Sequence, residues 1–133
     1  IGAPPMNFLP AQISNGQAGL YVDTGAFKLP LDANHPAKQL VGKPVTLGIR
    51  PEAIFDASLN NPIATTEHNT IEAKVEILEP LGPSYTAYLK AGDHPIQATI
   101  DSATRIEVDR LGKFCVNLDA LHIFDSETDL AVR

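Results

Sequence analysis

Residues that could carry out chemistry are few in this sequence and widely spaced. Its four histidines are His35, His68, His94 and His122. None has a histidine, cysteine or acidic partner at the spacing of a zinc site. Asp125, Glu127 and Asp129 alternate as in a calcium loop, but the glycine and the distal glutamate of such a loop are missing. We therefore expect no bound metal, and surface or capping roles for the histidines.

Motifs of catalytic sites are also missing. The sequence contains no GxxxxGK[ST] phosphate loop, no GxGxxG after a strand and no GxSxG elbow. Asp101, Glu107 and Asp109 show no acid–base pairing and fit a solvated face. The single cysteine, Cys115, lies in an alternating run, which predicts a half-buried strand residue, and a chain without an internal disulfide fits a reducing compartment. We expect neither a catalytic residue nor a cofactor site in this chain.

Composition and charge narrow the class of protein. The 133 residues are 44% hydrophobic and 20% charged, which is typical of one compact folded domain. No apolar run approaches the roughly 18 residues that a membrane-spanning helix needs. The net charge of −6, without clustered Lys or Arg, argues against a nucleic acid partner. Because the chain starts at Ile1 and its only methionine is Met6, we interpret it as a piece of a longer protein.

The elements that must position any site are predicted to be short strands, because apolar residues recur with period two. The clearest strand spans residues 71–78, where Ile71, Ala73, Val75 and Ile77 should share the core face. Similar runs predict strands at 7–13 (interrupted by Pro10), 20–22, 26–29, 45–49, 85–89, 96–100, 114–118 and 122–124. Residues 36–40 predict one helical turn, and Asn15-Gly16 predicts a hairpin turn.

This pattern of strands predicts an all-β, OB-fold-like small barrel, or a pair of such barrels, with little helix. Residues 55–70 are polar and turn-rich, so we expect them to form the loop that joins two halves of a single domain spanning residues 1–133.

The strand at 45–49 ends in an unusual corner, with the sequence GIRPE. Gly48 lets another segment approach closely, and Pro51 fixes its own backbone and keeps Arg50 extended. Arg50 carries a permanent charge, and Glu52 suits the exposed N–H groups of a turn. Two interpretations remain open. Arg50 and Glu52 either pin the corner within the barrel, or face another domain or subunit.

Several short motifs in a fixed order resemble one known family. These are the start Ile1-Gly2-x-Pro4-x-Met6-Asn7-Phe8-Leu9, the GIRPE corner about forty residues later, Glu79-Pro80-Leu81-Gly82, Gly112 before a strand, and His122-Ile123-Phe124-Asp125. Together they resemble the C-terminal regulatory domain, or TOBE (transport-associated OB) domain, of the ATP-binding subunit of ABC importers of the maltose and sn-glycerol-3-phosphate type. Ser84 and Asp129 depart from residues that the family often carries.

This resemblance implies a regulatory, dimer-stabilising and non-catalytic module. Its implied partners are its own N-terminal ATPase domain, a second copy of the subunit, membrane permease subunits reached through the ATPase domain, and a regulatory protein. ATP and Mg²⁺ would bind the upstream domain, and the complex would be cytoplasmic, at the inner face of the membrane. Its structural or interface candidates are Gly48, Arg50, Pro51, Glu52, Glu79 and Gly82.

A second function remains open from the residues themselves. Related OB-type modules bind small oxyanions such as molybdate, and an oxyanion site needs N–H groups, hydroxyls and a cation. Gly82, Ser84, Thr86 and Lys90 are the candidates to supply them here.

Overall fold

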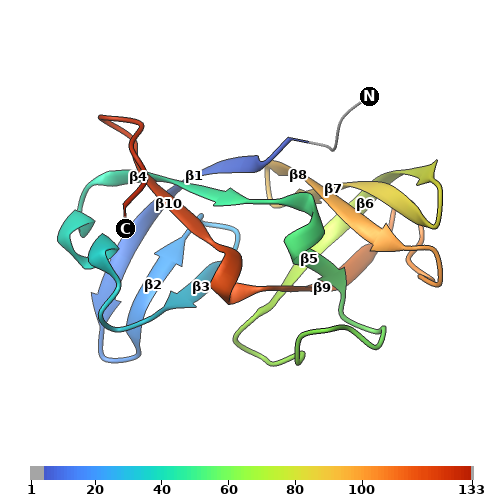
Figure 1. Ribbon diagram of the computed structural model, residues 1–133, viewed down its shortest axis with the longest axis horizontal. Coiled ribbons are helices and arrows are strands. Elements are labelled where there is room, and N and C mark those ends of the chain that lie inside the picture. The colour runs from blue at the N-terminus through green and yellow to red at the C-terminus, as the bar shows by residue number, and fades with distance from the viewer. Residues whose placement is uncertain (1–4, 133) are drawn as a thin grey trace.

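Two curled antiparallel sheets lie side by side in the computed structural model, which describes residues 5–132 (Figure 1). Each sheet has five strands within that range. The described residues otherwise contain only three short 3₁₀ turns, so the expected all-β, OB-like architecture with little helix is confirmed.

The first sheet has the strand order β10-β4-β1-β2-β3. Its strands are β1 (Asn7–Gly16), β2 (Gly19–Asp23), β3 (Lys28–Leu31), β4 (Pro44–Ile49) and β10 (His122–Asp125). The predicted helical turn is the 3₁₀ turn η1 (Pro36–Leu40), where the His35 imidazole accepts a hydrogen bond from the Ala37 N–H. Pro10 does not interrupt β1, which pairs through it, and the hairpin turn lies at Gln17-Ala18, two residues beyond the predicted Asn15-Gly16.

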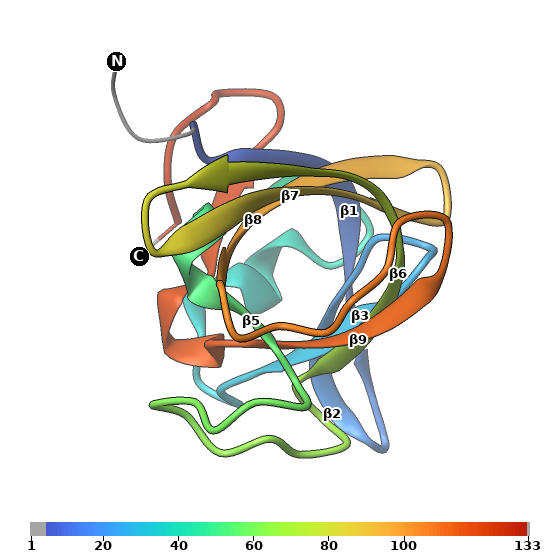
Figure 2. The same ribbon diagram turned by 90° about the vertical axis from the view of Figure 1, so that its right-hand side faces the viewer.

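The second sheet has the strand order β5-β9-β6-β7-β8. Its strands are β5 (Ile54–Asp56), β6 (Thr70–Leu81), β7 (Ser84–Ala91), β8 (His94–Asp101) and β9 (Leu111–Val116). The end view in Figure 2 shows these strands curling into a ring, which brings β5 close to β8. The second sheet is therefore a small barrel in its own right.

A β-bulge in β6 corrects one predicted core position. The register with β7 shifts between Val75 and Ile77, so one extra residue interrupts the alternation. Ile71, Ala73 and Val75 are buried as expected, but Ile77 is turned outward and is 53% exposed. The sequence pattern continued smoothly through the bulge and did not reveal it.

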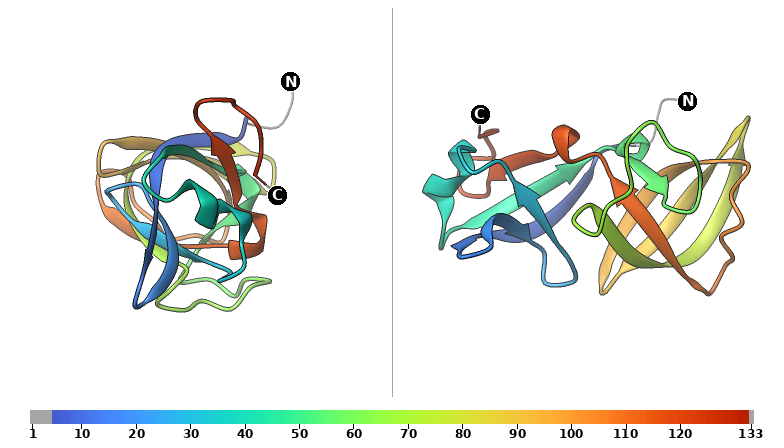
Figure 3. Two further views of the ribbon diagram at one scale, coloured as in Figure 1. Left: turned by 90° about the vertical axis from the view of Figure 1, so that its left-hand side faces the viewer. Right: turned by 90° about the horizontal axis from the view of Figure 1, so that it is seen from below.

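The chain crosses between the sheets at two short segments, which Figure 3 shows from below. The 3₁₀ turn η2 (Pro51–Ala53) leads from β4 to β5, and the turn η3 (Leu118–Ala120) leads from β9 back to β10. The prediction that residues 55–70 join the two halves is therefore wrong. Residues 55 and 56 belong to β5, and residues 57–69 connect β5 to β6 within the second sheet. Polar turn residues are typical of any loop, whether it connects two strands of one sheet or joins two sheets.

Buried apolar side chains from both sheets form one continuous core cluster. Leu9, Leu47 and Ile49 represent the first sheet in it, and Leu89 and Phe114 represent the second; each is at most 1% exposed. Burial of such side chains contributes about 1.5–3 kcal/mol each, so the alternation read from the sequence accounts for most of the packing. No helix among residues 5–132 has the length and apolar character needed to cross a membrane.

Candidate interface at the meeting point of three motifs

Gly48 lies where three motifs from distant parts of the sequence meet. In register it stands between Phe8 of β1 and His122 of β10. A Cβ atom added at Gly48 would lie 2.6 Å from the Met6 sulfur, 3.0 Å from Cε2 of Phe124 and 3.3 Å from Cβ of His122. Glycine is therefore required here by close approach of side chains rather than by its backbone angles. Gly48 was singled out from the GIRPE motif alone, which does not indicate the residues that occupy the space above it.

The side chains over Gly48 form an aromatic cluster, which we define as Met6, Phe8, His122 and Phe124. The rings of Phe8 and Phe124 meet edge to face with centroids 5.8 Å apart, and the His122 ring stacks on Phe124 at 6.4 Å. Phe8 nevertheless remains 59% exposed. A large aromatic side chain that is ordered by its neighbours yet open to solvent is typical of an interface.

Asn7 ties this end of the first sheet to the second sheet. Its side-chain amide donates hydrogen bonds to the carbonyl oxygens of Ile49 at 2.9 Å and of Gln97 at 2.8 Å. Its side-chain oxygen accepts a hydrogen bond from the Gln97 N–H at 2.7 Å. The side chain is buried, so these bonds replace contacts with water. The sequence analysis missed Asn7, although it stands where an apolar residue is expected, two positions before Leu9 on the core face of β1.

A second contact between the sheets lies at the β7–β8 hairpin. The His94 ring nitrogen Nε2 bonds the Thr24 carbonyl oxygen at 2.9 Å. A Cβ at Gly92, whose φ is +57°, would lie 2.9 Å from the Ala26 Cβ, so the turn there is packed closely against the β2–β3 turn. His94 therefore serves as a link between the sheets rather than as a free surface residue.

The GIRPE corner carries the chain from the first sheet to the second. Pro51 and Ala53 are buried, and η2 packs against β8. The Ala53 carbonyl oxygen accepts a hydrogen bond from the Asn117 N–H at 2.9 Å, which joins the two crossing segments. Arg50 and Glu52 are exposed, and neither has a salt-bridge partner among residues 5–132. Pro51 thus turns the chain, while the geometry gives no support to the interpretation that Arg50 pins the corner.

Glu79 and Gly82 lie apart from this surface, on the β6–β7 hairpin of the second sheet. Gly82 has a φ of +58° and forms the turn between the two strands, a conformation that glycine adopts without strain. A hydrogen bond with the Glu79 carboxylate, together with burial and the negative charge, raises the pKa of Tyr88 on the neighbouring strand. Of the six predicted residues, the structure brings together Gly48, Arg50, Pro51 and Glu52, and leaves Glu79 and Gly82 elsewhere.

Ile1, Gly2 and Pro4 of the first motif lie outside the described residues. Among residues 5–132, no group of three His, Cys, Asp or Glu side chains is placed to hold a metal. Cys115 is buried, and its sulfur accepts weak hydrogen bonds from Asn61 and Thr65 at 3.7 and 3.6 Å. The arrangement around Gly48 therefore offers packing and hydrogen-bonding surface rather than reactive groups.

Comparison with known protein families decides the classification. Residues 2–54 match the MalK OB fold domain, and residues 65–110 match the TOBE domain. The chain belongs to the MalK OB fold and TOBE families. The first match ends at Ile54, directly after the GIRPE corner, so the corner is the junction between the OB fold and the TOBE part. β10 then returns the chain to the sheet of the OB fold.

Relatives of these OB fold and TOBE domains are ATP-binding proteins of sugar importers. The chain is 33% identical over 136 residues to the trehalose/maltose import ATP-binding protein MalK of Thermococcus litoralis. This alignment covers 99% of the chain and 36% of that protein. It is 30% identical over 138 residues to the oligosaccharides import ATP-binding protein MsmX of Bacillus subtilis, covering all of the chain and 36% of that protein. The chain thus spans about a third of the length of these relatives.

A solved structure shares the fold of the OB fold and TOBE domains. The cytoplasmic molybdate-binding protein ModG, in a molybdate-bound crystal form, superposes with a TM-score of 0.67 over 92% of this chain and 96% of ModG. Sequence identity is 12%, so the likeness concerns the fold alone.

Proposed function

We propose that this chain is the regulatory and dimer-stabilising part of the ATP-binding subunit of a carbohydrate ABC importer, and that it takes no part in ATP chemistry itself. Support comes from the family matches and from relatives that are import ATP-binding proteins for sugars. ATP and Mg²⁺ bind the separate ATPase domain, and the permease is reached through that domain. The complex works at the cytoplasmic face of the membrane.

The observation that carries this proposal is the exposed aromatic cluster beside the GIRPE corner. Met6, Phe8 and Phe124 present apolar surface, while Arg50 and Glu52 add an exposed cation and anion that have no salt-bridge partner among residues 5–132. Aromatic residues and arginine are enriched at the centres of protein interfaces. The proposed occupant is an ATPase domain of the subunit, since the relatives are import ATP-binding proteins of which this chain covers 36%.

Dimer stabilisation requires a second surface that meets its own copy across a two-fold axis. Such a patch faces itself, so like charges at its centre would repel. Strand faces with small and apolar residues are the candidates for such a patch, as around Tyr85, Ala87, Tyr88 and Phe114. Ala87 and Phe114 are fully buried, which leaves only the half-exposed tyrosines Tyr85 and Tyr88 of that set for contact.

The experiment that tests the aromatic cluster uses the full-length subunit assembled with its permease. Phe8→Ser removes the most exposed ring of the cluster, and Val108→Ser is the matched control, because Val108 is 47% exposed in a loop of the second barrel. We expect Phe8→Ser to lower solute uptake per ATP hydrolysed severalfold while ATP affinity is unchanged, and Val108→Ser to behave like the parent. Parental uptake with Phe8→Ser would contradict the assignment of this surface.

The alternative of an oxyanion sensor built on Gly82, Ser84, Thr86 and Lys90 has weaker support. The Ser84 hydroxyl is bonded to the Leu81 carbonyl oxygen at 3.0 Å, and Thr86 is buried. The three grooves found over residues 5–132 are lined by other residues. Calorimetry with molybdate and tungstate separates the two functions, since the regulatory proposal predicts no heat of binding.

A further inference from the structure

A groove of the second barrel is built between two loops, residues 57–69 and residues 102–110. Its volume is about 870 Å³. Asp56 holds the two loops together: one carboxylate oxygen accepts hydrogen bonds from the N–H and hydroxyl of Ser58, and the other accepts one from the hydroxyl of Thr104. Asp56 is only 3% exposed, so its carboxylate organises the walls from within and adds one negative charge to the lining of the groove.

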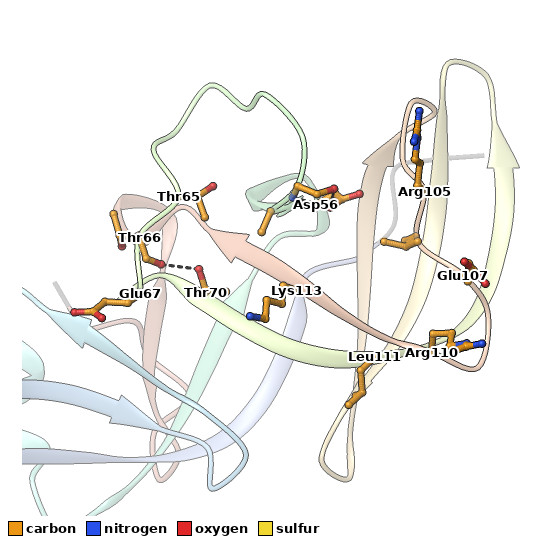
Figure 4. A pocket seen from close by; sticks show the side chains of 13 residues that line it. Asp56, Thr65, Thr66, Glu67, Thr70, Arg105, Glu107, Arg110, Leu111 and Lys113 are labelled. Atoms are coloured by element: carbon orange, nitrogen blue, oxygen red, sulfur yellow. Dashed lines mark hydrogen bonds between the residues drawn. The ribbon is translucent and has the colours of Figure 1, made fainter.

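Three cations line this groove: Arg105, Arg110 and Lys113. Figure 4 shows Lys113 directed toward the segment that carries Thr66 and Thr70, while the ends of Arg105 and Arg110 point away from Lys113 on the other side of the groove. None of the three has a salt-bridge partner within the part of the chain that the structure describes, although Glu107 also lines the groove and Glu72 stands opposite Lys113 in the sheet. Unpaired cations in one groove are notable in a chain whose net charge is −6.

The wall opposite the arginines offers a free hydroxyl donor. The Thr66 hydroxyl oxygen accepts hydrogen bonds from the N–H groups of His68 and Asn69, both at 3.2 Å, so its own proton is left to donate. The buried Asn69 fixes this segment, because its side-chain oxygen accepts the Thr66 N–H at 2.9 Å and its amide donates to the Ala64 carbonyl at 2.7 Å. A carboxylate, Glu67, also lines the groove, but it lies 3.5 Å from the His68 ring and is directed to solvent.

Apolar surface completes the groove. Leu111 is 71% exposed, which is unusual for a leucine in a strand, and Ile106, which also lines the groove, lies against the neighbouring Gly112. The volume of this groove lies within the range of pockets that bind small organic molecules and is much larger than the volume that an inorganic anion requires. Cations and a hydroxyl donor suit a phosphate group, while the leucine and isoleucine suit the apolar face of a sugar ring.

We infer that this groove binds a small organic phosphate, of the chemical class of a phosphorylated sugar. Lys113 and the Thr66 hydroxyl meet the phosphate oxygens, and Arg105 and Arg110 supply positive charge from the facing loop. Ile106 and Leu111 lie beneath the carbon skeleton. The site lies in the second barrel, partly within the TOBE match at residues 65–110, and does not depend on the function proposed above.

Titration of the isotope-labelled chain, followed by amide NMR shifts, tests the inference with glucose 6-phosphate, glucose and inorganic phosphate as probes. We expect saturable shifts within residues 57–69 and 102–113 for glucose 6-phosphate, weaker binding of inorganic phosphate and none of glucose. Lys113→Gln should weaken the binding of glucose 6-phosphate at least about tenfold. Lys90→Gln, the same charge change at an exposed lysine outside the groove, should alter it by less than about twofold.

Each remaining outcome overturns the inference. Absence of saturable shifts at about 10 mM glucose 6-phosphate, where even a site with a dissociation constant of about 6 mM would be more than half filled, removes the site. Equal weakening by Lys113→Gln and Lys90→Gln would show attraction to overall charge only. Equal affinity for glucose and glucose 6-phosphate would show that the groove does not recognise the phosphate group. Equal affinity for inorganic phosphate and glucose 6-phosphate would show that it does not recognise the sugar.

Discussion

The side chain of Asn7 holds the backbone of Gln97 through both of its polar groups. It donates to the Gln97 carbonyl oxygen at 2.8 Å and accepts from the Gln97 N–H at 2.7 Å, although 90 positions separate the two residues. The same amide also reaches the carbonyl oxygen of Ile49, the last residue of β4. One buried side chain therefore sets the position of the second barrel relative to the first strand and to the GIRPE corner.

Asn7→Ala should destabilise the chain more than a surface substitution. It leaves backbone groups of Ile49 and Gln97 without their partners, and each buried unsatisfied group costs about 1–3 kcal/mol. Since Gln97 is partly open to water, we expect a total loss of about 2–3 kcal/mol in the free energy of unfolding, measured by urea denaturation. Asn15→Ala, at an exposed position of the same strand, is the control and should change stability by less than about 0.5 kcal/mol. Equal free energies of unfolding for the two variants would rule out the stabilising role of the Asn7 hydrogen bonds.

Gly48→Ala should reveal how closely the aromatic cluster packs on β4. The added methyl group displaces the flexible Met6 side chain and pushes against the Phe124 ring, so we expect a loss of about 1–3 kcal/mol. Gly16→Ala is the matched control, because a Cβ there meets no atom within 4 Å and the residue has no positive φ. If thermal denaturation gives equal stability for both variants, the cluster does not need glycine beneath it.

Arg50→Ala should leave the fold nearly unchanged. A pinning role for Arg50, one of the two interpretations that the sequence left open, would imply a large cost, but the exposed side chain has no salt-bridge partner among residues 5–132. We now expect a change of less than about 0.5 kcal/mol in the isolated chain. In the full-length subunit the same substitution should alter regulation of ATP hydrolysis. A loss of stability above about 1.5 kcal/mol in the isolated chain would restore the pinning interpretation.

The Tyr88 phenol should ionise at a higher pH than an ordinary tyrosine, because Glu79 raises its pKa. The neutral phenol is favoured in the folded state, so this contribution to stability is complete below the unfolded pKa near 10 and is lost as the pH rises through the folded pKa. Glu79→Gln should lower the pH at which the Tyr88 phenol ionises, as followed by Tyr88-resolved NMR. Glu127→Gln, the same charge change at an exposed position, should not. A lower or unchanged pKa of Tyr88 in the parent chain would contradict the role of Glu79.

Strand positions were predictable because burial on one face imposes strict alternation. Residues 71–75 show this most clearly, and the turn at residues 36–40 followed from its proline and its polar cap. The bulge after Val75 was not predictable, because Glu76 and Ile77 continue the alternating pattern while the register shifts. The joining role of residues 55–70 failed for a similar reason, since composition identifies a loop but not the strands that it connects.

The site was predictable only in part. The residues around Gly48 were found as separate motifs, and their convergence depends on the pairing of β1, β4 and β10, which no local pattern specifies. Asn7 did leave a signal, because it is the polar member of a series in which Leu9, Ala11 and Ile13 are buried. A polar residue on the core face of a strand indicates a buried hydrogen-bonding role. The groove at Lys113 left no signal in the sequence, because its walls come from two loops that are far apart along the chain.

In the proposed function, this chain stabilises the dimer of an ATP-binding subunit without performing its chemistry. Sedimentation velocity of the full-length subunit, compared with a version truncated before Ile1 of this chain, tests that claim most directly. Without ATP, we predict a dimer for the full-length subunit and a monomer for the truncated one, which keeps the ability to bind ATP. Equal dimerisation of the two proteins across the same range of concentrations would contradict the claim.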